Sequence, residues 1–222
     1  MKPLRIGIFG GSFDPVHQGH MEVAVAVCNR LSLDRVEFVP AFRAPHKKSA
    51  ATASHWHRFA MLVLATTAHE KFFVSPIELE LSRPAYTIET IQRFKQQWPD
   101  QTEFYFILGA DSLAEITSWK DYETLLSSCH FVAVNRPGHD LSVNHLPESA
   151  HRRVIDLRVS SLPATSPHEP VIYLCTDVAN PISSTDIRRA LKEGKRVEAI
   201  PPMVWQHIEK YQLYQGTDET TE

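Results

Sequence analysis

The chain is poor in cysteine and has no long hydrophobic run. Its three cysteines, Cys28, Cys129 and Cys175, are widely spaced and form no CxxC pair. This usage argues against a disulfide framework and favours a reducing compartment. No apolar run approaches the length of about 20 residues that spans a bilayer, and the N-terminus lacks a signal-peptide pattern. We therefore expect a cytoplasmic protein that does not associate with membranes.

Clustered positive charge is also missing. The 222 residues carry a formal net charge of −3, and no block of Lys or Arg stands out beyond Lys47-Lys48. Because a nucleic-acid surface needs clustered basic residues, we expect no nucleic-acid partner. Hydrophobic residues make up 43% and charged residues 22% of the chain, as in a globular protein with one well-buried core.

Short apolar runs alternate with helical patterns. The runs that predict strands are Leu4–Phe9, Val36–Val39, Phe72–Ser75, Phe104–Leu108, Phe131–Val134 and Val171–Leu174. Apolar residues spaced by three or four predict helices over 21–31, 56–64 and 88–98. This alternation predicts an α/β fold: a Rossmann-like, doubly wound, mainly parallel sheet with helices on both faces.

The C-terminal part predicts a small helical region. Ser183-Ser184-Thr185-Asp186 has the pattern of a capping box that opens a helix, and Gly194 marks its end. Pro201-Pro202 then opens a last helix, with Val204, Ile208 and Tyr211 expected on one face.

We expect a single domain over residues 1–215, with the helical part at about 183–215 and a disordered tail at 216–222. Between residues 138 and 170 the chain is rich in proline and polar residues. There we predict only a short helix around 148–153 and irregular loop.

The segment 10–20, GGSFDPVHQGH, joins the first predicted strand to the first predicted helix. A glycine-bearing loop before a helix N-terminus offers backbone N–H groups and the positive end of the helix dipole to phosphate. The imidazoles of His17 and His20 add donors that can follow charge onto phosphate oxygens. Zinc would need further ligands, and no cysteine or carboxylate lies at a matching spacing. The segment therefore predicts a nucleoside triphosphate site.

The same segment resembles a known motif. His17-Gln18-Gly19-His20 is similar to the His-x-Gly-His motif of the nucleotidyltransferase superfamily, and the preceding GGSFDP resembles the bacterial nicotinate-nucleotide adenylyltransferase family. Further segments match that family in its order, up to about residue 190. They are Pro45-His46-Lys47, Ala85-Tyr86-Thr87, Gly109-Ala110-Asp111-Ser112, Trp119, Arg136-Pro137-Gly138 and Ile182-Ser183-Ser184-Thr185-Asp186-Ile187-Arg188.

This resemblance implies an enzyme of NAD biosynthesis. The reaction would transfer an adenylyl group from ATP to nicotinate mononucleotide and give deamido-NAD and pyrophosphate. It would proceed by direct in-line attack without a covalent intermediate, so positioning and charge stabilisation carry most of the catalysis. Mg²⁺ is expected, bound mainly through the ATP phosphates, and we name no protein ligand for it. The oligomeric state stays open, a homo-oligomer included.

The resemblance also implies roles for individual residues. The catalytic candidates are His17, His20 and Arg188, with His20 closest to the α-phosphate. The candidates for ATP binding are Gly10, Gly11, Ser12, Phe13, His17, Gly19, His20, Gly109, Asp111, Ser184 and Arg188. Asp111 would hold ribose hydroxyls or water around Mg²⁺, or would act as a helix N-cap. Ser184 and Arg188 would form a second phosphate element at a helix start, where the alternative is ordinary capping and a solvated arginine.

Five residues are candidates for binding the acceptor. Ala85-Tyr86-Thr87 resembles the Ser-Tyr-Thr segment that faces the nicotinate ring and its carboxylate in the family. Trp119 would stack on the pyridine, unless it is a core aromatic. Lys47 would contact a phosphate or carboxylate, or lie in a solvated loop. Arg136 would bind the mononucleotide phosphate, or serve as a turn residue.

Two other functions stay open at this point. The first is adenylyl transfer to a different acceptor, nicotinamide mononucleotide or phosphopantetheine. The second is nucleotide binding without turnover. Ala85-Tyr86-Thr87 and Trp119 argue against the first. The presence of His17, His20 and Arg188 argues against the second.

Overall fold

The computed structural model describes residues 3–42, 53–135, 141–163, 167, 169–175 and 182–215. Within them the chain forms one parallel sheet of seven strands in the order β3-β2-β1-β4-β5-β7-β6. The strands are β1 (Arg5–Gly11), β2 (Arg35–Pro40), β3 (Phe72–Val74), β4 (Glu103–Gly109), β5 (His130–Val134), β6 (Val154–Asp156) and β7 (Ile172–Cys175). The predicted α/β class and parallel sheet are confirmed.

The strand β6 was not predicted, because irregular loop was expected there. It has three residues, all half-buried, and it pairs only with β7 at the edge of the sheet. A strand this short carries no readable period, so its pairing depends on the neighbouring strand and not on its own pattern.

The predicted helices are present, and two short helices that were not predicted, α4 and α5, lie between β4 and β5. The α-helices are α1 (Gln18–Arg30), α2 (His55–Thr66), α3 (Thr87–Gln97), α4 (Ala110–Ala114), α5 (Tyr122–Leu126), α6 (Glu148–His151), α7 (Ser184–Lys192) and α8 (Pro202–Lys210). At the start of α7, Ser183 Oγ accepts the Asp186 N–H at 3.1 Å, as a capping residue should. Past its end, Gly194 has φ of 70°, which glycine adopts without steric cost.

Helices cover both faces of the sheet. Buried side chains of α1, α2, α7 and α8 pack in one cluster with one face of the central strands, and those of α3, α4 and α5 pack in a second cluster with the other face. In the last helix Val204 and Ile208 are buried as predicted, but Tyr211 is half exposed, so its predicted place on the apolar face is wrong. It follows the last residue of α8, where the helical period no longer applies.

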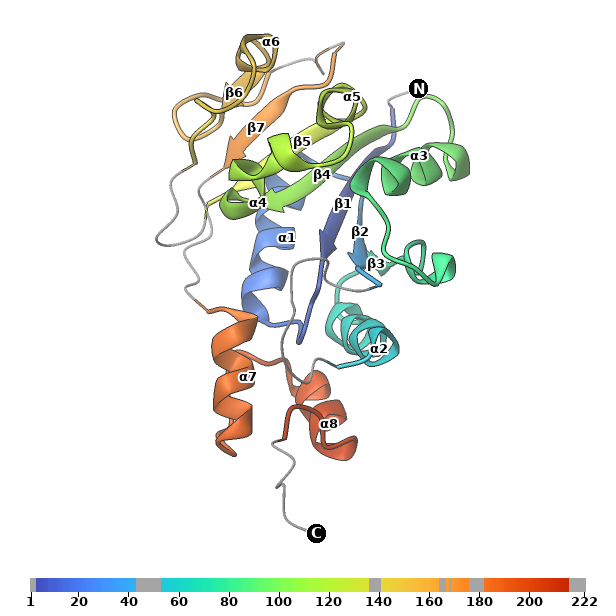
Figure 1. Cartoon of the computed structure of the whole chain (residues 1–222), viewed down its shortest axis with the longest axis vertical. Coiled ribbons are helices and arrows are strands. Elements are labelled where there is room, and N and C mark those ends of the chain that lie inside the picture. Colours follow the sequence, from blue (N-terminus) through green and yellow to red (C-terminus); the bar gives the residue numbers. More distant parts are fainter. Residues whose placement is uncertain are drawn as a thin grey trace.

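The order of the strands places the loop after β1 at the centre of the molecule. β1 pairs with β2 on one side and with β4 on the other, so successive connections diverge at this point. In open α/β sheets ligands bind at this position, outside the carboxyl ends of the strands. Figure 1 shows α7 and α8 lying beyond the carboxyl ends of β1 and β2, at the far end of the molecule from β6 and α6.

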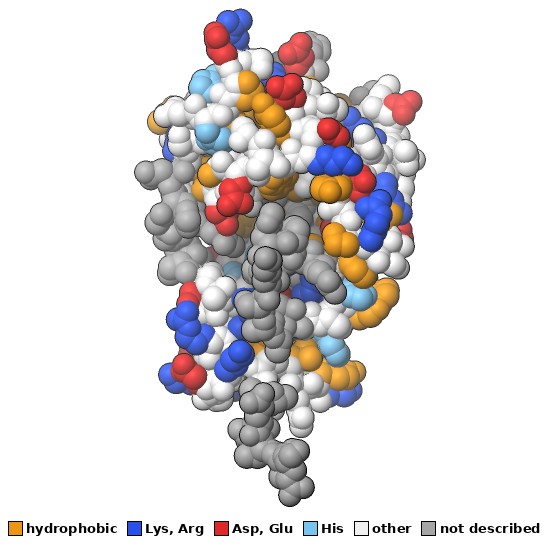
Figure 2. All heavy atoms as spheres, in the orientation of Figure 1, with side chains coloured by type: hydrophobic (Ala, Val, Ile, Leu, Met, Phe, Trp, Pro, Cys, Tyr) orange, Lys and Arg blue, Asp and Glu red, His pale blue; other side chains and the backbone are white. Residues whose placement is uncertain are grey.

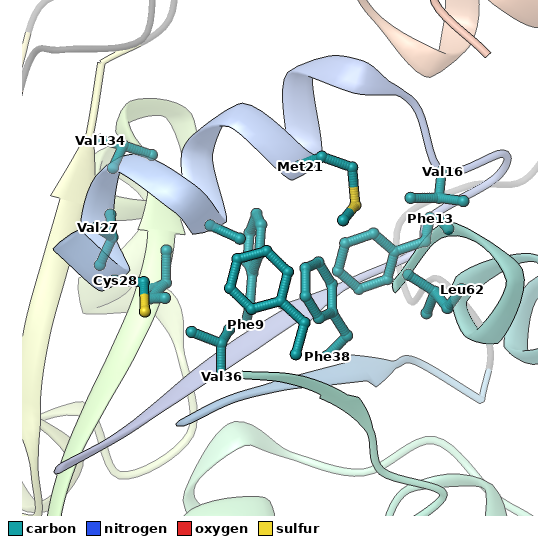
Figure 3. Packing of buried hydrophobic residues seen from close by; sticks show 14 of the residues in the cluster. Phe9, Phe13, Val16, Met21, Val27, Cys28, Val36, Phe38, Leu62 and Val134 are labelled. Carbon is teal, nitrogen blue, oxygen red and sulfur yellow. The ribbon is translucent and has the colours of Figure 1, made fainter. Parts of the chain in front are cut away.

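Aromatic side chains of the core pack beneath the loop between β1 and α1. The ring of Phe13 packs edge-on against Phe9 and tilted against Phe38, with centroid distances of 5.4 and 5.7 Å. Figure 3 shows this group beneath α1, with Met21 and Leu62 beside Phe13. A Cβ on Gly11 would lie 3.1 Å from the Phe13 ring, so glycine there lets the ring fold under the loop.

None of the described helices is long and apolar enough to cross a membrane. Cys28, Cys129 and Cys175 are buried and form no disulfide bond. The predicted tail at 216–222 lies outside the described residues.

Candidate active site

The two histidines of the loop meet at the start of α1. His17 is the N-cap residue in extended conformation, and its backbone N–H donates to Nδ1 of His20 at 3.3 Å. The two ring centroids lie 3.8 Å apart. His20 is partly exposed, whereas His17 is only 2% exposed. Since Nδ1 of His20 accepts a hydrogen bond, its proton in the neutral form is on Nε2.

The N-terminus of α1 is less open than the sequence suggests. The Gln18 N–H donates to the carbonyl oxygen of Ala199 at 2.8 Å, and the His17 N–H is taken by His20. Gly19 is buried in the first turn. Phe13 has φ of 47° and its ring lies in the core, so only its backbone is available to a ligand.

The buried Arg58 on α2 ties together three segments around the loop. Its guanidinium donates to the carbonyl oxygens of Ser12 at 2.7 Å, Ala41 at 2.6 Å, Phe42 at 3.1 Å and Ala53 at 3.2 Å. The pKa of Arg58 is lowered overall, because the effect of burial exceeds the opposing effect of the nearby acidic groups. The sequence analysis did not select Arg58. Its position three and four residues before Met61 and Leu62, on the buried face of α2, is the signal that could have found it.

Asp14 is a second residue that the sequence analysis missed. Its side chain is buried, and its Oδ1 accepts the hydroxyl of Tyr214 at 2.6 Å and the N–H of Ala53 at 3.1 Å. Tyr214 follows α8, 200 residues further along the chain. No spacing in the sequence relates these residues, so only the folded chain reveals the contact.

The start of α7 lies against the same loop. Arg188 Nη1 donates to the carbonyl oxygen of Asp14 at 2.7 Å, and Ser184 Oγ donates to that of Pro15 at 3.2 Å. Arg188 also donates to Thr185 Oγ1 at 3.3 Å. The structure therefore brings together the two segments that the sequence predicts for the triphosphate.

The carboxyl end of β4 lies next to β1 and supplies Gly109 and Asp111. Gly109 is the N-cap residue of α4, and Asp111 is the exposed second residue of that helix. The N-cap alternative for Asp111 is therefore wrong, because the helix begins at Ala110, two residues earlier than that alternative requires. Within the described ranges, no three His, Cys, Asp or Glu side chains are grouped so that they could hold a metal.

The acceptor candidates lie around the start of α3. Tyr86 is its N-cap residue and is half exposed, and Thr87 opens the helix. Lys120 Nζ lies 4.5 Å from the centroid of the Tyr86 ring. Trp119 is partly buried and packs edge-on against Phe106, with a centroid distance of 6.3 Å. Its ring thus has both core contacts and an exposed part.

Lys47 and Arg136 lie outside the described residues, so the structure does not place these two acceptor candidates.

A partly buried acid contacts the first turn of α3. Thr90, one turn into α3, donates to Glu78 Oε1 at 2.7 Å. Burial raises the pKa of Glu78 to about 7, while the Thr90 hydrogen bond and the charge of Arg58 lower it and the charge of Glu89 raises it. The sequence analysis did not select Glu78.

Comparison with known proteins identifies the family. The cytidylyltransferase-like family model matches residues 8–190. A Thermoanaerobacter sp. (strain X514) protein named "Probable nicotinate-nucleotide adenylyltransferase" is 39% identical over 219 residues, which is 98% of each chain. One of the same name from Leifsonia xyli subsp. xyli is 40% identical over 213 residues, 96% of this chain and 94% of the relative. The chain belongs to the nicotinate-nucleotide adenylyltransferase family. The resemblance stated from the motifs is confirmed.

Solved structures share the fold of this nicotinate-nucleotide adenylyltransferase family member. The Plasmodium falciparum nicotinic acid mononucleotide adenylyltransferase complexed with NaAD superposes with a TM-score of 0.71 at 23% identity, over 95% of this chain and 97% of that one. The same enzyme complexed with APC gives a TM-score of 0.70 over the same shares. The cytidylyltransferase-like match ends two residues after Arg188, so α8 and Tyr214 lie beyond it.

Proposed function

We propose that the loop between β1 and α1 and the first turn of α7 together bind the triphosphate of ATP. The enzyme transfers the adenylyl group to nicotinate mononucleotide, the reaction for which its relatives are named. The hydrogen bond from Arg188 to the carbonyl oxygen of Asp14, at 2.7 Å, is the observation that supports our assignment of the site. It joins two predicted phosphate-binding segments that are 174 residues apart.

The chemistry needs no covalent intermediate. A phosphate oxygen of nicotinate mononucleotide attacks the α-phosphorus of ATP, the bond from that phosphorus to the bridging oxygen breaks, and pyrophosphate leaves with the electron pair. Deamido-NAD is the other product. Negative charge grows on the α-phosphate oxygens and the leaving group, so positioned donors provide the main stabilisation.

In this proposal His20 donates from Nε2 to an α-phosphate oxygen. The His17 ring is buried next to that of His20. It therefore reaches a phosphate oxygen only if the residues that cover it move when ATP binds. Arg188 and Ser184 bind the β- and γ-phosphates beside the α7 N-terminus. The backbone of residues 10–13, Gly19 and Gly109 lines the nucleotide, and the Phe13 side chain supports it from the core.

We further propose that Mg²⁺ accompanies ATP and is held mainly by its phosphates. The donor set fits this arrangement, since one exposed carboxylate, Asp111, lies at the carboxyl end of β4, and magnesium keeps several waters. The metal would screen the triphosphate charge. Asp111 would contact its water shell or the ribose hydroxyls.

For the acceptor, we propose that the N-terminal turn of α3 receives the nicotinate carboxylate and that Trp119 covers the pyridine. Thr87 offers a hydroxyl and a backbone N–H at a helix start, where an anion is favoured. Lys120 adds a positive charge beside Tyr86. Nicotinamide lacks the negative charge that these groups favour, so the acid should be preferred.

The test is pyrophosphate release by purified protein with ATP and Mg²⁺, comparing nicotinate mononucleotide with nicotinamide mononucleotide and phosphopantetheine. We expect turnover with the acid at a kcat/KM at least about tenfold above that of the amide. Release with the amide or with phosphopantetheine alone would overturn the acceptor assignment and keep the ATP site. ATP-analogue binding without release from any acceptor would support a nucleotide-binding module instead.

A further inference from the structure

The side chain of Tyr214 reaches the nucleotide loop from the C-terminal end of the described chain. Its hydroxyl donates to Asp14 Oδ1 at 2.6 Å, and its ring is 5% exposed. Burial and the negative charge of Asp14 raise the pKa of Tyr214 far above its usual range, so the hydroxyl stays a donor at any physiological pH. A buried carboxylate needs such a donor, because it has lost its hydration.

We propose that Tyr214 is a positioning residue for the ATP site, acting through Asp14. The inference rests on the proposed triphosphate role of the loop between β1 and α1. It adds to that role a residue from outside the cytidylyltransferase-like match, which ends at residue 190. Tyr214 touches no proposed ligand position itself and acts by holding the loop.

Asp14 is the point where the two phosphate segments meet. Its carbonyl oxygen accepts from Arg188 Nη1, and the carbonyl oxygen of the next residue, Pro15, accepts from Ser184 Oγ. His17 follows three residues after Asp14. A shift of Asp14 would therefore displace Arg188, Ser184 and the histidines relative to one another. Small misplacements of this kind lower the rates of reactions that depend on positioning.

The backbone conformation at residues 212–214 directs the Tyr214 side chain toward Asp14. Gln212 and Tyr214 both have positive φ, 51° and 65°, which costs energy for residues other than glycine. Between them, the Leu213 N–H donates to the carbonyl oxygen of Ile208 at 3.0 Å. Strained residues persist where surrounding contacts over-determine them, and here the contacts include the hydrogen bond to Asp14.

The helix before Tyr214 is anchored to α2. His57 Nδ1 and His207 Nε2 lie 3.1 Å apart, and the Tyr211 ring contacts both imidazoles, with centroid distances of 4.9 and 4.7 Å. Figure 2 shows hydrophobic and histidine side chains gathered on this side of the molecule, over α2 and α8. The contact between α2 and α8 thus fixes the position of the helix that precedes Tyr214.

The test replaces Tyr214 with Phe in the full chain, which removes only the hydroxyl. We expect the KM for ATP, and the Kd of a non-hydrolysable ATP analogue measured by calorimetry, to rise about three- to tenfold. The KM for nicotinate mononucleotide should change by less than about twofold. Tyr211→Phe is the matched control, because it removes the hydroxyl of a half-exposed tyrosine three residues earlier and keeps the ring that contacts His57 and His207.

Two truncations give an independent test. A chain ending at Leu213 should bind the ATP analogue as weakly as Tyr214→Phe, or more weakly. A chain ending at Gln215, which keeps Tyr214, should bind it like the full chain. Equal analogue affinity in both truncations would contradict the proposal.

A double variant tests the route through Asp14. Asp14→Asn keeps an acceptor at Oδ1, and combined with Tyr214→Phe it should weaken ATP-analogue binding by less than the product of the two single effects. Tyr214→Phe with a lowered Tm but unchanged analogue Kd would show a role in stability alone and overturn the inference. Analogue binding by the wild type without pyrophosphate release would refute the proposed reaction, while the Tyr214 comparison would still be decided by binding.

Discussion

The imidazole rings of His17 and His20 lie 3.8 Å apart, and the backbone N–H of His17 donates to Nδ1 of His20. This hydrogen bond selects one tautomer of the neutral His20 ring and leaves Nε2–H as the donor. A phosphate oxygen that gains charge needs a donor of this kind, already oriented. The local backbone of the motif therefore selects the tautomer of neutral His20 that the proposed chemistry uses.

His20→Ala should lower kcat by about 10²–10³, because losing one positioned donor to transition-state charge costs about 2.7–4 kcal/mol. The measurement is pyrophosphate release at saturating ATP and nicotinate mononucleotide. His151→Ala, an exposed histidine on α6, is the control and should keep the wild-type kcat. A His20→Ala enzyme within about threefold of the wild type would rule out the α-phosphate role.

Arg188→Lys should raise the KM for ATP by about tenfold or more and affect the acceptor less. Lysine keeps the charge but cannot reproduce the planar fork, and hydrogen bonds to charged groups contribute about 1.5–3 kcal/mol. Initial rates with each substrate varied in turn separate the two KM values. Arg189→Lys is the neighbouring control, since the Arg189 side chain is 69% exposed and pairs with Asp186 at 3.4 Å. If both variants raise the KM equally, Arg188 has no special role.

Trp119→Ala should raise the KM for nicotinate mononucleotide by about tenfold, with the KM for ATP nearly unchanged. Removing the ring takes away a flat apolar cover, for which aromatic stacking contributes about 0.5–1.5 kcal/mol beyond area burial. Trp98→Ala controls for lost packing, because Trp98 is also partly buried against the same core cluster but lies at the other end of α3. A similar KM increase in Trp98→Ala would mean that Trp119 acts only through the core.

The partly buried Glu78 should make stability depend on pH. Its pKa is raised from 4.5 to about 7 by burial, so between these values the folded protein binds more protons than the unfolded chain. The free energy of unfolding should therefore fall as pH rises through about 4.5 to 7, by at most about 3 kcal/mol from this group.

Glu78→Gln keeps an acceptor for Thr90 and removes the titration. We expect the variant to gain stability relative to the wild type as pH is raised from 5 to about 8. Urea unfolding at several pH values measures this difference. Glu80→Gln is the control, because the Glu80 side chain is 52% exposed. A stability difference between Glu78→Gln and the wild type that does not vary with pH would contradict the assignment.

Local patterns were enough to predict most of the fold. The strands, the long helices and the capping box at Ser183 depend on near neighbours in the chain, and the structure has them within a few residues of the expected bounds. The edge strand β6 was missed because three residues carry no period. Tyr211 was misplaced because α8 ends one residue before it.

For the site, the sequence by itself determined the family and selected the loop after β1 with its two histidines as the candidate site, because these depend on residue order within short segments. Only the tertiary structure decided that Phe13 points into the core and that Arg58 holds three segments by their carbonyl oxygens. It alone brought Tyr214 to Asp14 across 200 residues. The physical reason is that a buried charge or hydroxyl takes whichever partner folding brings within about 3 Å, and no spacing along the chain encodes that distance.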